Sequence, residues 1–138
     1  MSQSIVCNLE NMHLFAIEVA STLRAGDIVT LSGDLGAGKT TFTKMLCKAL
    51  SINSIVSSPT FTYLNIYDEK VAHFDLYRLK SGEHFFALGF DEFLGGEYIA
   101  IIEWPEIVIN ELTGNIISLT FTHHHQGRKV TRNDPIHI

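Results

Sequence analysis

A chain of 138 residues with 46% hydrophobic and 18% charged residues has the composition of a globular protein, and we take residues 1–138 as a single domain. The formal net charge of −5 argues against wholesale nucleic-acid binding, and no apolar run approaches the ~20 residues of a membrane span. The two cysteines match no metal or redox pattern and the first residues resemble no secretory signal, so we expect a cytoplasmic protein without a membrane partner.

Taken in chain order, the hydrophobic periodicity predicts strands that alternate with helices. The predicted elements are a strand over 5–9, a helix over 12–23, a strand over 27–33, a helix over 39–50, a hairpin over 61–67 and 71–77, a helical region over 81–96 broken at Gly89, a strand over 98–103, a helix over 104–112 and closing strands over 115–121 and 128–132. Asn8 and Asn11 are the candidate caps of the first helix. This alternation predicts an α/β fold, and the hairpin makes the sheet mixed, only partly parallel.

The loop at 33–41, with the sequence GDLGAGKTT, carries the most specific single pattern in the chain. Gly33, Gly38, Lys39 and Thr40 match G-x-x-x-x-G-K-[ST], with an apolar strand before the loop and an amphipathic helix after it. Glycines let backbone amides close around phosphate oxygens, and the helix dipole favours the anion. The pattern therefore predicts a P-loop NTPase-like fold of three layers. The candidate nucleotide-binding residues of the loop are Leu35, Gly36, Ala37, Gly38, Lys39, Thr40 and Thr41.

Two side chains of this loop have predicted roles. Lys39 should reach the β- and γ-phosphates, and the Thr40 hydroxyl should bind Mg²⁺. GTPases usually carry an N-K-x-D motif that reads the base, and the sequence contains none. We therefore expect ATP as the nucleotide and Mg²⁺ as the metal cofactor.

A bound Mg²⁺ needs a carboxylate at the end of a neighbouring strand, and two candidates exist. Glu103 ends the continuous apolar run YIAIIE, which predicts a buried strand whose carboxyl end meets the phosphates. Asp75 ends VAHFD, whose alternation predicts a half-exposed hairpin strand. We assign Glu103 to the metal, directly or through water, and Asp75 to an attacking water that it orients or deprotonates. The reverse assignment stays open.

Three further features have competing interpretations. Thr60 could be a switch threonine that senses Mg²⁺ and the γ-phosphate, or part of a plain Ser/Pro turn, and the sequence favours neither. Trp104 is interpreted as a core residue in preference to a nucleotide contact. The histidines at 123–125 are interpreted as a mostly solvated loop, since strand neighbours point to opposite faces and cannot share a metal.

Four segments in this order resemble the TsaE (YjeE) family of ATPases in bacterial tRNA threonylcarbamoyladenosine biosynthesis. They are GDLGAGKTT at 33–41, SPTF at 58–61, HFDLYRL at 73–79 and IEWPE at 102–106. The resemblance extends from Ile5 to about Thr131. A small departure is a phenylalanine at the end of SPTF, where tyrosine is common in the family.

The resemblance implies a particular use of ATP. Proteins of this family are weak ATPases that join a TsaB–TsaD heterodimer. TsaD transfers the threonylcarbamoyl group to adenosine 37 of tRNAs that read ANN codons, and the hydrolysing subunit supports repeated turnover. For this chain the resemblance implies protein partners, only indirect contact with tRNA, and a monomer or weak oligomer when alone.

The resemblance also assigns site residues. Asp75 matches the family's aspartate needed for hydrolysis, which with Lys39 makes the candidate catalytic pair, and Glu103 matches the metal-linked glutamate. Arg128 matches a carboxyl-terminal Gly-Arg near the nucleotide. Glu10, just before the first predicted helix, matches an acidic position near the base.

Two other functions compete with this interpretation. A small P-loop kinase would normally close an Arg-bearing lid over the transferred phosphoryl group, yet no Lys or Arg lies between Lys80 and Arg128. A nucleotide switch that does not hydrolyse ATP needs only one metal-binding acid, whereas Asp75 and Glu103 supply two. Both observations favour water as the acceptor of the phosphoryl group.

Overall fold

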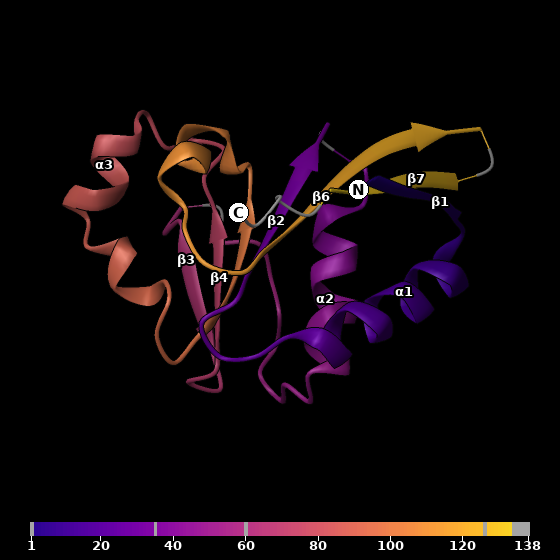
Figure 1. The fold of residues 1–138 in the computed structure, drawn as a ribbon, viewed down its shortest axis with the longest axis horizontal. Coiled ribbons are helices and arrows are strands. Elements are labelled where there is room, and N and C mark those ends of the chain that lie inside the picture. The colour runs from indigo at the N-terminus through magenta and orange to yellow at the C-terminus, as the bar shows by residue number, and fades with distance from the viewer. Residues whose placement is uncertain (1, 35, 60, 126, 134–138) are drawn as a thin grey trace.

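One mixed β-sheet organises the chain (Figure 1). The computed structural model describes residues 2–34, 36–59, 61–125 and 127–133. In chain order the elements are β1 (Ser2–Cys7), α1 (Leu9–Thr22), β2 (Ile28–Gly33), α2 (Lys39–Ala49), β3 (Leu64–Tyr67), β4 (Val71–Asp75), α3 (Gly82–Ala87), η1 (Phe90–Phe93), β5 (Ile99–Glu103), η2 (Pro105–Ile107), η3 (Ile109–Glu111), β6 (Ile116–His124) and β7 (Gly127–Asn133). Across these described ranges, no helix has the length and apolar character needed to cross a membrane.

The topology of the sheet confirms the predicted mixed α/β architecture. Within the described residues the strand order is β1-β7-β6-β2-β5-β4-β3. β6, β2, β5 and β4 are parallel to their neighbours in this central group, whereas β7 and β1 at one edge and β3 at the other are antiparallel. Parallel strands present their carboxyl ends at one edge of the sheet, so the ends of β2, β4 and β5 are brought together.

Two apolar layers cover the two faces of the sheet, which confirms the three-layer prediction. On β2, Val29 and Leu31 pack in the layer that contains α1 and α2, whereas Ile28 packs in the layer that contains α3. Phe42 of α2 ties the first layer together, with its ring 5.8 Å from Phe15 and 5.4 Å from Phe121. Figure 1 shows α1 and α2 side by side and α3 well apart from both.

The predicted hairpin is present, but its second strand is buried more completely than its alternation predicted. β3 pairs antiparallel with β4 as expected, with Leu64 opposite Phe74. The residues of β4 from Val71 to Phe74 are all buried, and His73 is 0% exposed. α1 and α2 cover one face of the sheet, and α3 covers the other. His73, the one polar side chain among these four buried residues, has a hydrogen-bond partner at each ring nitrogen. The expectation of a half-exposed strand was therefore wrong.

The segment 104–112 is not the predicted α-helix but a pair of short 3₁₀ turns, η2 and η3. Trp104 has left-handed backbone angles, with φ 59° and ψ 59°, which no α-helix continues. Pro105 supplies no amide donor, and Val108, with φ −125° and ψ 0°, interrupts the two turns. The β-branched side chains in this segment also lower its helix propensity.

Other elements agree with the sequence. Asn8 rather than Asn11 caps α1, because the Asn8 side chain accepts a hydrogen bond from the Asn11 amide. The helical region after residue 81 is broken at Gly89, whose φ is 76°. β6 continues to His124, so two of the three consecutive histidines lie at the end of a strand rather than in the predicted loop.

Candidate nucleotide site

The loop between β2 and α2 has the backbone that its glycines permit. Gly33, Gly36 and Gly38 have φ values of 131°, 74° and 105°, a region that other residues rarely adopt. A Cβ on Gly33 would lie 2.1 Å from the Phe121 carbonyl oxygen on β6, so the loop leaves the sheet where only glycine fits. α2 begins directly afterwards at Lys39, and its first amides are unpaired within the helix. This is the geometry of an anion-binding helix terminus.

Lys39 is held inside the loop rather than in solvent. Its ammonium donates a 2.5 Å hydrogen bond to the Gly33 carbonyl and lies 3.3 Å from the centre of the Trp104 ring. The residue is only 5% exposed. Burial lowers the pKa of the ammonium from its usual value, opposed by the nearby carboxylates, of which Glu103 has the largest effect. A phosphate that replaced the carbonyl and the indole as partners would meet a cation already held inside the loop.

Thr40 and Glu103 join α2 to the end of β5. The Thr40 hydroxyl donates to Oε1 of Glu103 over 3.2 Å, and Glu103 is only 2% exposed. The side chains therefore bring a hydroxyl and a buried carboxylate together at the first turn of α2, directly after the glycine loop. Oxygen donors of this kind are the ligands that Mg²⁺ prefers.

Asp75 stands next to Glu103 on the neighbouring strand. The parallel register of β4 and β5 pairs these two residues directly. One carboxylate oxygen of Asp75 accepts from the Ser58 hydroxyl at 3.0 Å, and the other accepts from the Tyr77 amide at 3.0 Å. Asp75 lines the same cavity above the loop as Glu103, but unlike Glu103 it is partly exposed. The two acids thus differ in burial and in hydrogen-bond partners, and their separate roles stay a prediction.

A buried histidine behind Glu103 was not among the predicted site residues. Nε2 of His73 donates to Oε2 of Glu103 at 2.5 Å, because a carboxylate can only accept. On its other side, Nδ1 lies 2.9 Å from the Tyr67 hydroxyl. The sequence signal that could have found it is its position two residues before Asp75, which places both side chains on one face of β4.

Trp104 forms a wall of the site and packs against the apolar layer that contains α3. Its ring is half-buried, lies under the Lys39 ammonium and packs 4.7 Å from the Tyr77 ring. The left-handed backbone turns the chain at the end of β5, and the ring lines the same cavity as Asp75 and Glu103. Trp104 thus packs against the core, as interpreted from the sequence, but it is only half-buried, and the sequence does not reveal the turn that places its ring in the cavity wall.

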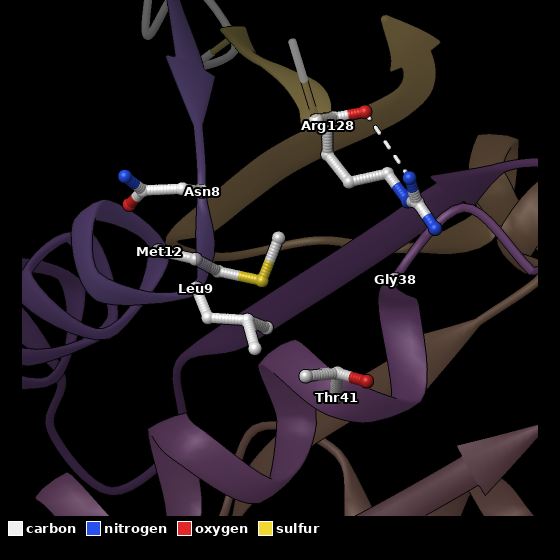
Figure 2. Close-up of a pocket in the computed structure, with 7 residues that line it drawn as sticks. Asn8, Leu9, Met12, Gly38, Thr41 and Arg128 are labelled. Carbon is white, nitrogen blue, oxygen red and sulfur yellow. Dashed lines mark hydrogen bonds between the residues drawn. The ribbon is translucent and has the colours of Figure 1, made fainter. Parts of the chain in front are cut away.

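Two adjoining cavities lie over the loop. One, of about 250 Å³, is lined by Lys39, Thr40, Asp75, Glu103 and Trp104 among others. The second, of about 360 Å³, is lined by Asn8, Leu9, Met12, Gly38, Thr41, Gly127 and Arg128. Figure 2 shows Leu9 and Met12 of α1 facing Thr41 of α2 across this second space. The first cavity is polar and charged, whereas the second has apolar side chains on the α1 side.

Arg128 belongs to the walls of both cavities. It reaches from β7 towards the start of α2, as Figure 2 shows, and its Nη2 donates to the Gly36 carbonyl at 3.2 Å. Its Nη1 donates to the Gly127 carbonyl at 3.1 Å, while its buried Nε has no acceptor among the described residues. A guanidinium with an unused donor beside the loop suits an anionic ligand.

The predicted site residues do not all lie together. Those that line the cavities are Gly36, Gly38, Lys39, Thr40, Thr41, Asp75, Glu103 and Arg128. Ala37 is fully buried below the loop. Glu10 is the second residue of α1 rather than a residue before it, is exposed, and lines neither cavity. Leu35 and Thr60 lie outside the described residues.

Comparison with known proteins identifies the family. A family model described as threonylcarbamoyl adenosine biosynthesis protein TsaE matches residues 6–132. The tRNA threonylcarbamoyladenosine biosynthesis protein TsaE of Bacillus subtilis (strain 168) is 40% identical over 108 residues, which are 76% of this chain and 67% of that protein. The protein of the same name from Rickettsia typhi is 44% identical over 109 residues, or 76% of this chain and 75% of that protein.

A solved structure agrees with these sequence relationships. The crystal structure of YdiB from Bacillus subtilis superimposes with a TM-score of 0.75 at 30% sequence identity, covering 96% of this chain and 83% of that chain. With a family match across 6–132 and close relatives of one name, this chain belongs to the TsaE family of threonylcarbamoyl adenosine biosynthesis proteins.

Proposed function

We propose that this protein is a Mg²⁺-dependent P-loop ATPase, weak when alone, that is required to form N6-threonylcarbamoyladenosine at position 37 of tRNAs reading ANN codons. The observation that carries the ATPase proposal is the Thr40–Glu103 hydrogen bond of 3.2 Å at the first turn of α2, with Asp75 beside Glu103 in register. A site that only bound phosphate would need the loop and lysine but not two differently placed carboxylates.

The phosphates of ATP fit the charged cavity, and the base fits the adjoining one. Backbone amides of the loop and the Lys39 ammonium supply donors for the phosphates. Leu9 and Met12 offer apolar surface for a flat base, and Thr41 connects the two spaces. Arg128 stands at the junction, where its unused Nε suits a phosphate or ribose oxygen.

The donor set suits a Mg²⁺ ion that shares its ligands with the nucleotide phosphates better than a metal ion held by protein side chains alone. The described residues hold no group of three or more His, Cys, Asp or Glu that could cage an ion. Thr40 and Glu103 supply two oxygen donors, and Mg²⁺ usually takes its other ligands from phosphates and water. When bound, the ion would neutralise charge on the β- and γ-phosphates. Thr40 and Glu103 would hold it, Glu103 directly or through water.

Asp75 is proposed to act on the attacking water. Its carboxylate is fixed by Ser58 and by the Tyr77 amide, and it lines the cavity rather than the core. A carboxylate in this position can orient a water and accept its proton as the oxygen attacks phosphorus. Lys39 would hold the γ-phosphate as negative charge moves towards the leaving ADP.

We propose that ATP hydrolysis by this chain acts on a partner protein. The family resemblance points to a TsaB–TsaD heterodimer as the partner, with tRNA contacted only indirectly. The net charge of −5 supports this, since a subunit with its own tRNA site would need a basic surface. Alone, the chain is proposed to be a cytoplasmic monomer or weak oligomer.

Phosphate release under multiple turnover tests the proposal. The chain is assayed with ATP and Mg²⁺ alone and with purified TsaB–TsaD, and the same mixtures are assayed for threonylcarbamoylated tRNA. Slow release alone, stimulation by the partners and modification that needs this chain would support the proposal. Nucleotide binding without any hydrolysis would favour a switch, and a phosphorylated metabolite from a small-molecule screen would favour a kinase.

A further inference from the structure

A continuous chain of polar groups runs inward from the metal-binding acid. Thr40 donates to one oxygen of Glu103, and His73 donates to the other at 2.5 Å. The Tyr67 hydroxyl is 2.9 Å from the far nitrogen of the His73 ring. Three of these residues come from adjacent strands, Glu103 from β5, His73 from β4 and Tyr67 from β3. The chain of polar groups therefore runs across three neighbouring strands, from β5 inside the sheet to β3 at its edge.

Every inner member of this chain is buried. His73 is 0% exposed, Glu103 2% and Tyr67 3%. Burying a carboxylate, an imidazole and a phenol together costs free energy that an apolar core would not, unless each group finds its partner. Their neighbours on the same face, Val71 and Ile101, are ordinary apolar core residues. The packing of the sheet thus does not require polar side chains at these positions, and a role in the site explains them.

The far end of the chain reaches the segment that holds Asp75. The Tyr67 hydroxyl donates to the Ser57 carbonyl at 2.8 Å and accepts from the Ser57 amide at 3.2 Å. The next residue, Ser58, donates its hydroxyl to Asp75 at 3.0 Å. One set of hydrogen bonds therefore connects Glu103, through His73 and Tyr67, to the backbone of Ser57. The next side chain, that of Ser58, holds Asp75.

We infer that His73 and Tyr67 are positioning residues that fix the Glu103 carboxylate for a bound divalent cation and couple it to the Ser57–Ser58 segment beside Asp75. This rests on the proposed Mg²⁺–ATP site. Neither residue is among those that line the two cavities. His73 holds one oxygen of Glu103, which leaves the other directed at Thr40, and Tyr67 holds the His73 ring. Mutation of residues that hydrogen-bond to metal ligands commonly lowers metal affinity or activity 10–100-fold.

Two substitutions of His73 distinguish the loss of its hydrogen-bond donor from the loss of its ring. The amide nitrogen of glutamine lies as many bonds from Cα as Nε2 of histidine, so His73→Gln keeps a donor for Glu103. The amide of asparagine lies one bond closer, so His73→Asn loses that donor while remaining polar. Tyr67→Phe removes only the hydroxyl. Tyr98→Phe and His84→Asn are matched controls on half-buried residues outside both cavities.

The test measures how affinity for a non-hydrolysable ATP analogue depends on Mg²⁺. Calorimetric titrations in EDTA and at stepped Mg²⁺ concentrations give the metal-free affinity and the Mg²⁺ concentration of half-maximal effect. We expect that concentration to rise about 10–100-fold in His73→Asn and about 3–10-fold in Tyr67→Phe, with His73→Gln within about threefold of wild type. Affinity in EDTA should stay within about twofold throughout, and the controls should match wild type.

The outcomes distinguish this inference from the proposed function. If the wild-type protein binds the analogue with a Mg²⁺ effect that His73→Asn leaves unchanged, the positioning role is overturned and the ATP site stands. If His73→Asn and His73→Gln lose affinity equally in EDTA and in Mg²⁺, the residue is structural and the inference also fails. A wild-type protein that binds no nucleotide would instead overturn the proposed function itself.

Discussion

The Thr40 hydroxyl donates a hydrogen bond to the Glu103 carboxylate across 3.2 Å, which joins the first turn of α2 to the end of β5. Asp75 lies beside Glu103 in the strand register but bonds to Ser58 and the Tyr77 amide instead. The two acids therefore have separate partners, and substitution of each should give a different defect.

Glu103→Gln should weaken Mg²⁺ binding, and Asp75→Ala should slow ATP hydrolysis. We expect Glu103→Gln to raise the Mg²⁺ requirement for ATP binding at least about tenfold, because a neutral amide replaces the carboxylate that we propose as a metal ligand. Asp75→Ala should bind Mg²⁺–ATP nearly as wild type but hydrolyse it about 10²–10⁴-fold more slowly, the usual contribution of a general base. Binding titrations and single-turnover phosphate release measure both. Loss of Mg²⁺-dependent binding in Asp75→Ala would show that the two roles are reversed.

Lys39→Met should weaken ATP binding without lowering the thermal stability of the nucleotide-free protein. Burial lowers the pKa of the Lys39 ammonium, so the charged form is disfavoured in the folded protein and costs free energy at neutral pH. We expect the nucleotide-free variant to melt at least as high as wild type, yet to gain less stability than wild type from the same concentration of ATP. ATP affinity should fall about 10–100-fold, in line with loss of a charged hydrogen bond.

The pH dependence of this comparison has a fixed sign. Where the folded-state pKa lies below 10.5, the unfolded chain binds more protons in the window between the two values, and wild-type stability rises with pH there. The advantage of Lys39→Met in nucleotide-free protein should therefore shrink as the pH approaches 10.5. Thermal melts across that range measure it, and an advantage that grew with pH would contradict the assignment.

Trp104 should report occupancy of the loop. It is the one tryptophan in the sequence, and the Lys39 ammonium lies 3.3 Å from its ring centre. Phosphates that draw the ammonium away remove a cation–π contact of about 0.5–2 kcal/mol and change the environment of the indole. We expect ATP to change the tryptophan emission in a saturable titration, and Lys39→Met to abolish most of that change. An equal change in Lys39→Met would mean that the indole responds to the base or to a loop movement instead.

Local sequence rules predicted the backbone of the glycine loop and the start of α2 well. The pattern from Gly33 to Thr40 depends on backbone angles and a helix start that are set within a few residues. Continuous burial of the run up to Glu103 likewise follows from its own composition. The parallel strand ends then bring Asp75 beside Glu103 without further information. The roles of the two acids remain predictions.

The rest of the candidate site depends on contacts between distant residues. Arg128 donates to the Gly36 carbonyl across 92 positions of sequence, and a motif near the end of the chain does not reveal that approach. His73 alternates with apolar residues as an exposed residue would, and only the partners on β3 and β5 make its burial tolerable. Trp104 adopts a left-handed backbone that its residue type disfavours, so local propensity pointed to the wrong element.

Two glycines of the loop should respond differently to the same added methyl group. In Gly33→Ala the Cβ would meet the Phe121 carbonyl at 2.1 Å and strain a φ of 131°, so β2 would have to part from β6. We expect a loss of about 3 kcal/mol or more in the free energy of unfolding. In Gly36→Ala the φ of 74° is strained, but the Cβ meets no atom of the described residues within 4 Å, so the loss should be only about 1–2 kcal/mol. Urea unfolding of both variants measures the difference, and equal losses would show that the clash with β6 is relieved by a local shift.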